Sequence, residues 1–401
     1  MHDNNKRVIK VAIVYHCIAH YREAVFHELC NTDENIEYTL ISGVSDCIPS
    51  LKTVDVYKSW LPVEQGGLRW RLVKNHWLKN KILWQDGVAS LGVSKEFDAI
   101  IYLGVVYHIS TWVSCILAKL TGKKIYMWSH GFLRQEPGLK GLMRSAFYRL
   151  ADGMLLYHHR ARELFIERGF SPEKLDVLYN SLDVSTQKKV RDQIESAELE
   201  LKRSEIFKNP SDPVLLWIGR LTSQKKLNML IQAARQLKNQ DTNVNILFVG
   251  EGPEKQSLSD EVDRCGLKKQ VCFYGASHNE DELGPLINLS DICIAPGEVG
   301  LTCMHSLVYG TPVITHDNPD FQMPEYEAIK PGVSGMFFKY GSIESLAETI
   351  KVWLDQGLPR DEIRDACFRV IDDYYNPSNQ VKIINNMVRG NPSIQFSLSE
   401  R

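Results

Sequence analysis

The feature of this sequence that most constrains its fold is a repeated alternation of short apolar runs with longer helix-prone segments. In the first half, strands are predicted over 8–15, 99–103 and 124–128, and each is followed by enough residues for a helix. The runs are continuously apolar, as expected of parallel strands that are buried on both faces. The alternation therefore predicts βαβ units and a parallel sheet.

The same alternation returns in the second half of the chain. Strands are predicted over 214–218, 245–249, 271–274 and 292–295, with helices over 225–237, 254–265 and 281–289. Because a single core stops growing at about 250 to 300 residues, the 401 residues suit two domains. We predict an N-terminal Rossmann-like domain over 1–185, a charged linker over 186–210, a C-terminal Rossmann-like domain over 211–375, and a helix and tail over 376–401 that return to the N-terminal domain.

Composition excludes several classes of protein. With 44% hydrophobic and 24% charged residues, the chain can form its cores without metal or disulfide, and a net charge of -2 argues against a nucleic-acid-binding surface. The nine cysteines include no C-x-x-C pair and are interpreted as buried thiols of a reducing cytoplasm. The first apolar run is too short to cross a bilayer, so we expect neither a signal peptide nor a membrane span.

Residues 68–84 interrupt the alternation by mixing basic residues with tryptophans. The segment contains Arg69, Arg71, Lys74, Lys79 and Lys81 interleaved with Trp70, Trp77 and Trp84. Basic amphipathic segments that carry tryptophan bind anionic membrane surfaces. A solvated helix whose tryptophans pack inward explains the pattern equally well, and the sequence leaves both interpretations open.

The strongest chemical signal follows the strand predicted over 214–218. Gly219 permits close approach of the backbone to a ligand, and Arg220 and Lys225 stand on the turn into the next predicted helix. Two cations that converge there, supported by a helix N-terminus, suit a nucleotide diphosphate. If this turn were the only evidence, the simpler interpretation would be that Arg220 and Lys225 are solvated.

Two further glycine-bearing turns follow strands of the same half. Gly250 and Gly252 follow the strand predicted over 245–249, and Gly297, Glu298 and Gly300 follow the strand predicted over 292–295. The second turn leads into a helix, whose first N–H groups can receive phosphate oxygens. The predicted donor-binding residues are Gly219, Arg220, Lys225, Gly250, Gly252, Glu298, Gly300, Leu301, Thr302 and His305.

In this order, the motifs resemble those of glycosyltransferase family 4. The matching motifs are Gly219-Arg220-Leu221, Lys225, Val249-Gly250-Glu251-Gly252-Pro253, Phe273-Tyr274-Gly275, Ser290-Asp291, Val299-Gly300-Leu301 and Gly310-Thr311-Pro312-Val313. The resemblance extends over about 214–350, and the combination is far more specific than any single motif.

The first half resembles the same family more loosely. The matching motifs are Ala19-His20-Tyr21-Arg22, Ser129-His130-Gly131 and Leu178-Tyr179-Asn180-Ser181-Leu182-Asp183. The resemblance implies that His130 acts near the transferred sugar as a catalytic residue and that His20 and Arg22 lie on the acceptor side. The alternative for His130 is a histidine that the backbone satisfies at the end of a strand.

The resemblance implies the GT-B fold, in which two Rossmann-like, doubly wound parallel-sheet domains face a cleft. It also implies retaining, metal-independent transfer from a UDP- or GDP-linked sugar, which is a substrate, so no cofactor is expected. Arg220 and Lys225, with the helix start near Leu301, would stabilise the leaving diphosphate. The acceptor would be a glycan or a lipid-linked glycan in surface-polysaccharide biosynthesis, and the enzyme would be cytoplasmic and peripheral on the inner membrane face.

Two positions depart from the family pattern. The family places glutamates where this chain has Gly297 and His305, and Glu298 follows one residue later than the first of them. We expect Glu298 to be catalytic and to contact the donor sugar, and His305 to take the ribose hydroxyls. Alternatively, Glu298 points to solvent and His305 packs under the loop. A nucleotide-sugar epimerase, a phosphorylase of the same fold and a catalytically impaired sugar-nucleotide-binding module remain as alternative functions.

Overall fold

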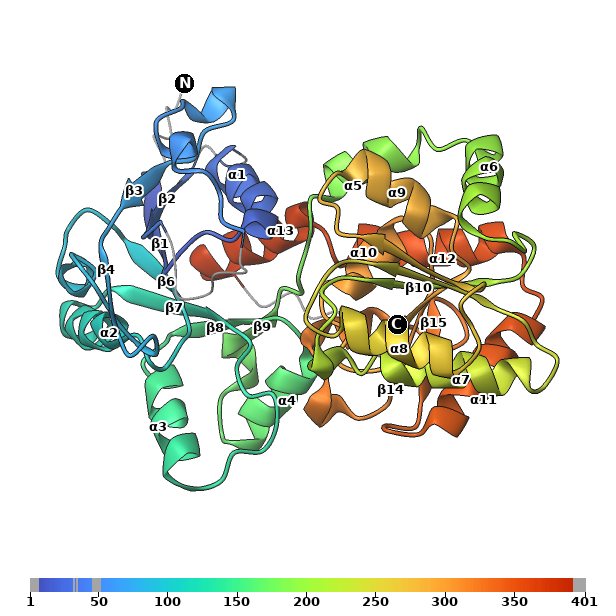
Figure 1. Cartoon of the computed structure of the whole chain (residues 1–401). Coiled ribbons are helices and arrows are strands. Elements are labelled where there is room, and N and C mark those ends of the chain that lie inside the picture. The colour runs from blue at the N-terminus through green and yellow to red at the C-terminus, as the bar shows by residue number, and fades with distance from the viewer. Residues whose placement is uncertain (1–6, 32, 34, 45–51, 392–401) are drawn as a thin grey trace. The chain divides into compact units, whose positions relative to one another are not determined.

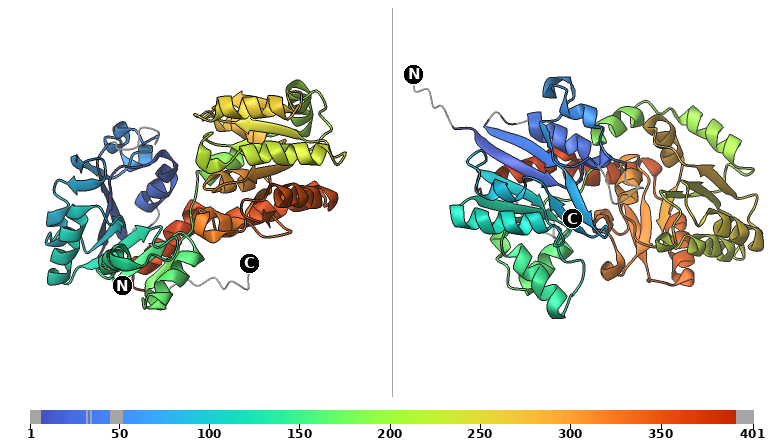
Figure 2. Two further views of the ribbon diagram at one scale, coloured as in Figure 1. Left: turned by 60° about the horizontal axis from the view of Figure 1, so that its bottom comes forward. Right: turned by 60° about the vertical axis from the view of Figure 1, so that its left-hand side comes forward.

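The computed structural model describes residues 7–31, 33, 35–44 and 52–391, and it divides into two units (Figure 1). One unit holds Met1–Asp183 together with Pro377–Arg401, and the other holds Val184–Asn376. Each contains a parallel sheet with helices against both of its faces (Figure 2). The predicted α/β class and the two Rossmann-like sheets are therefore confirmed.

The first unit is built on a seven-stranded parallel sheet in the order β3-β2-β1-β6-β7-β8-β9. Its strands are β1 (Ile9–Tyr15), β2 (Ile36–Ser42), β3 (Trp70–Leu72), β6 (Ala99–Leu103), β7 (Lys124–Ser129), β8 (Gly153–Leu156) and β9 (Leu175–Val177). Its helices are α1 (Glu23–Asn31), α2 (Ile109–Thr121), α3 (Gly138–Tyr148), α4 (His159–Glu167) and α13 (Pro377–Val388). Strand order reverses direction between β1 and β6, as in doubly wound folds.

The second unit is built on a six-stranded parallel sheet in the order β12-β11-β10-β13-β14-β15. Its strands are β10 (Val214–Ile218), β11 (Asn245–Val249), β12 (Val271–Gly275), β13 (Ile292–Ala295), β14 (Val313–His316) and β15 (Gly335–Phe338). Its helices are α5 (Val184–Arg191), α6 (Ser196–Ile206), α7 (Asn228–Lys238), α8 (Lys255–Arg264), α9 (Glu280–Asn288), α10 (Thr302–Val308), α11 (Ile343–Asp355) and α12 (Arg360–Asp373). The predicted strands agree with these bounds to within a residue.

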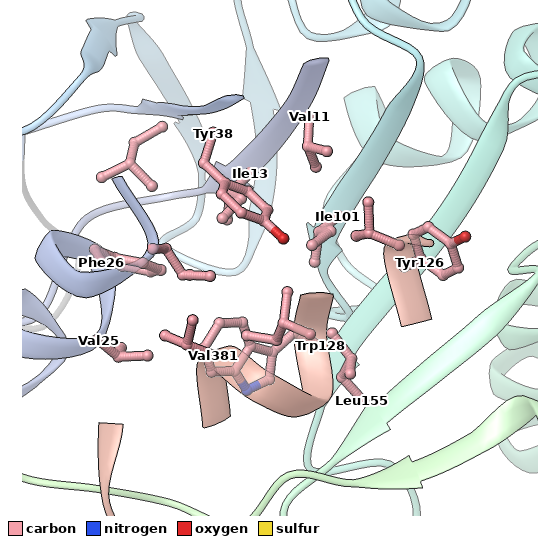
Figure 3. Close-up of a cluster of buried hydrophobic side chains, with 14 of the residues drawn as sticks. Val11, Ile13, Val25, Phe26, Tyr38, Ile101, Tyr126, Trp128, Leu155 and Val381 are labelled. Carbon is pink, nitrogen blue, oxygen red and sulfur yellow. The ribbon is translucent and has the colours of Figure 1, made fainter. Parts of the chain in front are cut away.

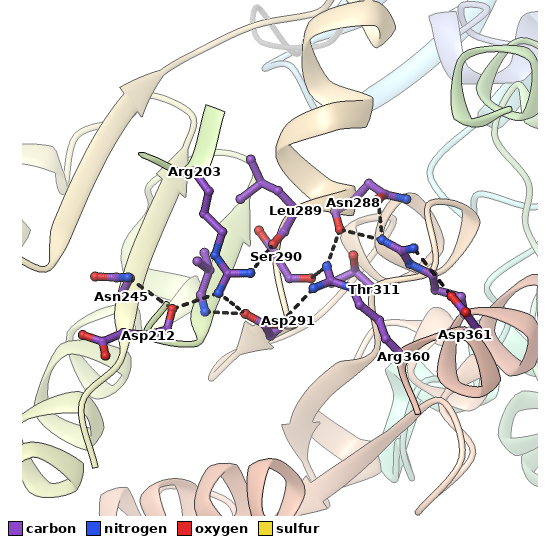
Figure 4. Close-up of polar contacts among 12 residues, drawn as sticks. Arg203, Asp212, Asn245, Asn288, Leu289, Ser290, Asp291, Thr311, Arg360 and Asp361 are labelled. Atoms are coloured by element: carbon purple, nitrogen blue, oxygen red, sulfur yellow. Dashed lines mark hydrogen bonds and ion pairs between the residues drawn. The ribbon is translucent and has the colours of Figure 1, made fainter. Parts of the chain in front are cut away.

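The charged linker expected over 186–210 is not a linker, because most of it forms α5 and α6 of the second unit. Arg203 of α6 forms an ion pair with Asp291, with 2.9 Å between Nη2 and Oδ2, and Arg360 of α12 reaches the other oxygen of the same carboxylate at 3.1 Å (Figure 4). Asp291 also accepts the backbone N–H of Val214 at 2.7 Å. The charges that made the segment resemble a linker therefore fix α6 to the sheet.

Residues 68–84 form strands, so the helix considered for this segment is wrong. Trp70 lies in β3, and the rest forms a hairpin of β4 (Asn75–Leu78) and β5 (Ile82–Gln85). Residues 79–81 connect the two strands, Lys79 and Asn80 adopt positive φ angles of 50° and 52°, and Lys81 N donates to the Leu78 carbonyl at 3.1 Å, which is the backbone of a tight hairpin turn. A tight turn separates the two halves, so the tryptophans cannot share one helical face.

The C-terminal helix α13 belongs to the first unit. Its apolar residues join the cluster that includes Phe26 and Trp128, and Figure 3 shows Val381 among these side chains. Polar contacts fix its orientation, since the Tyr38 hydroxyl donates to Asn385 Oδ1 at 2.6 Å and Gln380 Nε2 donates to the Tyr179 carbonyl at 2.9 Å. A segment distant in sequence thus completes the core of this unit.

The structure also bears on the membrane-spanning helix and the cysteines considered from composition. In the part of the chain that the structure describes, no helix is both long and apolar enough to span a bilayer. The described cysteines are all free thiols, and Cys115, Cys293 and Cys367 are among the buried ones. Burial raises the pKa of the Cys115 thiol to about 12, so it stays protonated at neutral pH.

Packing of α13 makes a testable contribution to stability. Ile384 is fully buried, so Ile384→Ala should lower the free energy of unfolding of the first unit by about 2 to 5 kcal/mol, the range for such truncations in a core. Leu120→Ala on α2 is the control, because Leu120 is 80% exposed and should have little effect. Urea unfolding followed by circular dichroism measures both. Equal midpoints for the two variants would contradict the packing described.

Candidate donor-binding site

The predicted donor-binding residues gather at one edge of the second sheet. Strand order reverses between β10 and β13, and in such sheets ligands bind beyond the carboxyl ends of the strands at this switch point. The turn 219–225 follows β10, the turn 250–253 follows β11, and the turn 296–301 follows β13. The site therefore consists of three loops from adjacent strands.

The glycines allow the first two loops to touch through their backbones. Gly219 N donates to the Val249 carbonyl at 2.9 Å. A Cβ atom on Gly250 would lie 2.0 Å from the Gly219 carbonyl oxygen, and one on Gly252 would lie 2.2 Å from the Leu221 oxygen. Both approaches exclude any side chain, so the glycines of the motif are needed for loop packing.

Lys225 lies within the site, but it does not begin the helix as expected. It ends the 3-10 turn η6 (Ser223–Lys225), Lys226 adopts a left-handed φ of 51°, and α7 starts only at Asn228. The Lys225 ammonium donates to the Glu298 carbonyl oxygen at 2.9 Å and contacts its carboxylate at 3.4 Å. Two predicted catalytic residues from separate loops are thereby brought together.

Arg220 has a different environment from Lys225. Its side chain is exposed, and among the residues that the structure describes it forms no hydrogen bond or ion pair. An arginine fork without protein partners retains all its donors for a phosphate group. The site thus contains one engaged cation, Lys225, and one available cation, Arg220.

The position where the family has its first glutamate cannot hold a side chain here. Gly297 N donates to the Lys225 carbonyl at 3.0 Å, and a Cβ atom on Gly297 would lie 2.1 Å from the Gln224 carbonyl oxygen. The loop after β13 is thus packed directly against the turn after β10. Glu298 is consequently the first residue of this loop that can present a carboxylate next to Lys225.

The remaining loop residues serve mainly to hold the backbone. Gly300 has a left-handed φ of 57°, and the Thr302 hydroxyl donates to the Ile218 carbonyl at 2.8 Å. Leu301 is the residue before the first turn of α10. Gln322, which no motif indicated, accepts the Val299 N–H at 3.1 Å through its side chain. The start of α10 is therefore tied to the end of β10.

His305 is held by a carboxylate that the motifs did not reveal. Its Nε2 lies 3.0 Å from Glu280 Oε2, and the Tyr309 hydroxyl donates to the same oxygen at 2.8 Å. Burial alone would raise the pKa of Glu280, but hydrogen bonds from His305, Tyr309 and Gln187 keep it below its usual value. The imidazole is thus hydrogen-bonded to protein, and its contact with ribose stays a prediction.

The first-unit residues lie at the carboxyl ends of their own strands. His130 follows β7, is exposed, and has its ring tilted against that of Tyr157, with 4.5 Å between the centroids. Desolvation by nearby protein, with the charges of Arg22 and His158, lowers the pKa of His130. His20 is exposed, whereas Arg22 is buried.

Several contributors to the site had no signal in the sequence. Glu280 and Gln322 come from segments outside the motifs, and only the fold brings them to His305 and Val299. A carboxylate in the first turn of a predicted helix is ordinary, so Glu280 could not be distinguished from other acidic residues. Within the described ranges no group of histidine, cysteine and carboxylate residues has the arrangement of a metal site.

Solved structures identify the fold. Anabaena HepE in complex with UDP has a TM-score of 0.70 and 16% identity, and the match covers 96% of this chain and 100% of that one. The apo form of the lipopolysaccharide outer core galactosyltransferase WaaB has a TM-score of 0.68 and 16% identity, over 95% and 99% of the two chains. The fold is that of the GT-B glycosyltransferases.

The second unit also matches a known family. Residues 199–367 match the family described as glycosyl transferases group 1. The 2-deoxystreptamine glucosyltransferase of Streptomyces kanamyceticus is 25% identical over 231 residues, 56% of this chain and 57% of that protein. The alpha-monoglucosyldiacylglycerol synthase of Streptococcus pneumoniae is 24% identical over 198 residues, 49% and 44% of the two. The chain spans about half the length of the curated relatives it matches.

Contact between the loops at Gly297 can be tested directly. Gly297→Ala should lower stability by about 1 to 3 kcal/mol, the usual cost of forcing atoms into a packed site, and should also weaken UDP binding. Gly297→Glu, which restores the glutamate of the family pattern, should do the same. Urea unfolding and titration calorimetry with UDP measure both quantities.

The control for these variants is Gly332→Ala. Gly332 has a positive φ of 75°, unlike Gly297, and a Cβ atom there would meet nothing within 4 Å. This variant therefore reports backbone strain without crowding and should leave UDP affinity unchanged. Full UDP affinity in Gly297→Glu would show that the loop does not need a glycine at this position.

Proposed function

We propose that the protein transfers a sugar from a nucleotide-sugar donor to a glycan or lipid-linked acceptor. The observation that carries the proposal is the arrangement of the exposed Arg220 and the Lys225–Glu298 pair on adjoining loops at the switch point of the second sheet. Two cations can hold a diphosphate while a neighbouring carboxylate accepts hydrogen bonds from the sugar hydroxyls. The match of this unit to the group 1 family supports the proposal.

In the proposed mechanism, catalysis is electrostatic. As the bond between the sugar and the diphosphate breaks, negative charge grows on the diphosphate, and Arg220 and Lys225 stabilise it more strongly than they stabilise the ground state. Lys225 exchanges part of its contact with Glu298 for the phosphate, which frees the carboxylate for the sugar. We infer retention of configuration from the resemblance to family 4, and the two cations take the charge-neutralising role that a metal has in other transferases.

We propose UDP as the first nucleotide to test, with GDP as the alternative. Similar structures of HepE are complexes with UDP and with UDP-glucose. Similar proteins include the lipopolysaccharide galactosyltransferase WaaB and a protein of the cps region of Klebsiella pneumoniae, which supports a role in surface-polysaccharide biosynthesis. Such a role would place the enzyme in the cytoplasm, at the inner face of the membrane.

Removing either cation should slow turnover. Arg220→Ala and Lys225→Ala should each lower kcat/KM by about 30- to 1,000-fold, corresponding to about 2 to 4 kcal/mol for an electrostatic catalytic group. Release of UDP from a panel of nucleotide sugars, with a polysaccharide extract as acceptor, measures the effect. Lys351→Ala is the control, because Lys351 pairs with Asp355 on α11.

The same assay separates the alternative functions. Without an acceptor, a transferase hydrolyses the donor slowly, whereas an epimerase would interconvert the sugar of the nucleotide. A binding module would hold the donor and turn over none of the acceptors. Near-normal turnover in both cation variants would remove the diphosphate from this site.

We also propose that the β4–β5 hairpin contacts an anionic membrane surface. Leu78 and Trp84 are 60% and 41% exposed, and Lys79 and Lys81 stand at the hairpin turn. Exposed tryptophan and leucine can enter the lipid interface, while lysines near the surface contribute about 1 kcal/mol each. Arg71 is less available because it pairs with Glu96.

Charge removal at the hairpin tests this contact. A double variant with Lys79→Gln and Lys81→Gln should lose about 10-fold or more in affinity for vesicles containing phosphatidylglycerol at low salt. Arg71→Gln is the matched control and should bind as the parent protein does. Sedimentation with vesicles measures all three proteins. Equal binding by the double variant and the parent would exclude the hairpin as a membrane contact.

A further inference from the structure

Arg22 is a buried cation without a counter-ion. Its side chain is 3% exposed, and no carboxylate of the described residues forms an ion pair with it. Its Nη2 donates to the Tyr157 hydroxyl, while its Nη1 is buried and has no hydrogen-bond partner among those residues. A guanidinium stays charged in proteins, so this site holds an uncompensated positive charge.

Aromatic rings compensate this charge only in part. The guanidinium carbon lies 4.9 Å from the centroids of the Trp128 and Tyr157 rings and 5.3 Å from that of Tyr21. Ring faces attract a cation, but they do not accept the N–H groups that point away from them. A buried N–H group without an acceptor lowers the stability of the fold. A bound ligand with an acceptor oxygen would remove this cost.

A second unmatched nitrogen lies in the same group of residues. His158 is 3% exposed and is the N-cap residue of α4, but its side chain makes no capping hydrogen bond, and its buried Nδ1 has no partner among the described residues. Arg22 and His130 both contact Tyr157, the residue before His158: Arg22 Nη2 donates to the Tyr157 hydroxyl, and the His130 ring lies 4.5 Å from the Tyr157 ring. His130 is the exposed member and gives the group access to solvent.

The group also has the location of a ligand site. Its members come from the segments that follow β1, β7 and β8, so they share the carboxyl edge of the first sheet. Arg22 ends the 3-10 turn His20–Arg22, which leads directly into the nine-residue helix α1, and the dipole of this helix adds positive potential at the same end. Three nitrogen-bearing side chains without a carboxylate among them form a site of one sign.

We propose that Arg22, with His158 and His130, binds an anionic group of the acceptor, a phosphate or a carboxylate. The inference rests on the proposed transferase function and narrows its acceptor to an anionic one. A phosphate or carboxylate oxygen would accept the free Nη1–H of Arg22, and a neutral histidine can donate a further hydrogen bond. The phosphate of a lipid carrier and the carboxylate of an acidic sugar share this chemistry.

The test is titration calorimetry of the full chain with UDP present in saturating amount, so that the donor site is filled. Octyl phosphate represents a lipid-linked phosphate, and methyl glucuronide represents an acidic sugar. We expect one of them to bind the parent protein and Arg22→Met to bind it at least 10-fold more weakly. Binding of octyl phosphate alone identifies a phosphate-bearing acceptor, and binding of methyl glucuronide alone identifies an acidic sugar.

Stability separates a binding role from a structural one. Replacing an unpaired buried cation by an apolar side chain of similar length should leave the melting temperature unchanged or raise it. Arg149→Met is the matched control, because Arg149 also lies over a ring, that of Phe170, but is exposed. It should bind both probes normally. If Arg22→Met fails to fold, Arg22→Lys keeps the charge without the planar fork and should still weaken binding.

Three outcomes would overturn the proposal. They are binding of neither probe by the parent protein, unchanged affinity in the Arg22 variants, and a loss of UDP affinity in Arg22→Met without an effect on the probes. The last would assign the anion to the donor diphosphate. Failure of the parent protein to bind UDP would instead count against the proposed function, and titration of the probes without UDP would still test the anion site.

Discussion

The hydrogen bond from Gly297 N to the Lys225 carbonyl is the contact on which the donor-binding site depends. It joins the loop after β13 to the turn after β10 at the point where strand order reverses. Because the two backbones touch there, Lys225 and Glu298 come within reach of each other. The same contact removes the space for a side chain at position 297, which explains why the carboxylate of this loop stands one residue later.

The protein neutralises the two cations of the candidate site to different extents. Lys225 is engaged by the carbonyl and carboxylate of Glu298, whereas Arg220 is exposed without protein partners. In the mechanism that we propose, a diphosphate would meet Arg220 first and would compete with Glu298 for Lys225. Such an exchange would couple capture of the diphosphate to release of the carboxylate that we assign to the sugar.

The two units differ in whether a buried charged group has polar partners. In the second unit, Asp291 is surrounded by Arg203, Arg360 and a backbone N–H, so its charge is matched (Figure 4). In the first unit, Arg22 has aromatic neighbours and one hydroxyl, and part of its fork stays unmatched. Matched networks hold a fold together, while unmatched buried donors mark places where a ligand can complete the structure.

The sequence by itself determined the strands of both sheets and the glycines of the second unit. Continuous apolar runs such as 214–218 and 245–249 have one stable environment, the interior of a parallel sheet. Gly250 was found from its motif after a strand, although the carbonyl that it approaches, that of Gly219, belongs to the neighbouring loop. Periodicity could not decide whether residues 68–84 were helix or hairpin, because two left-handed residues at the turn override it.

Tertiary structure alone decided which side chains act together. Glu280 meets His305, α13 completes the first core, and the segment 186–210 packs as helices, all through contacts between residues far apart in the chain. A charged residue looks the same in sequence whether it faces solvent or an ion-pair partner, as Arg203 shows. Local pattern therefore fixes elements, whereas partners and buried charges such as Arg22 are set by the packing of those elements.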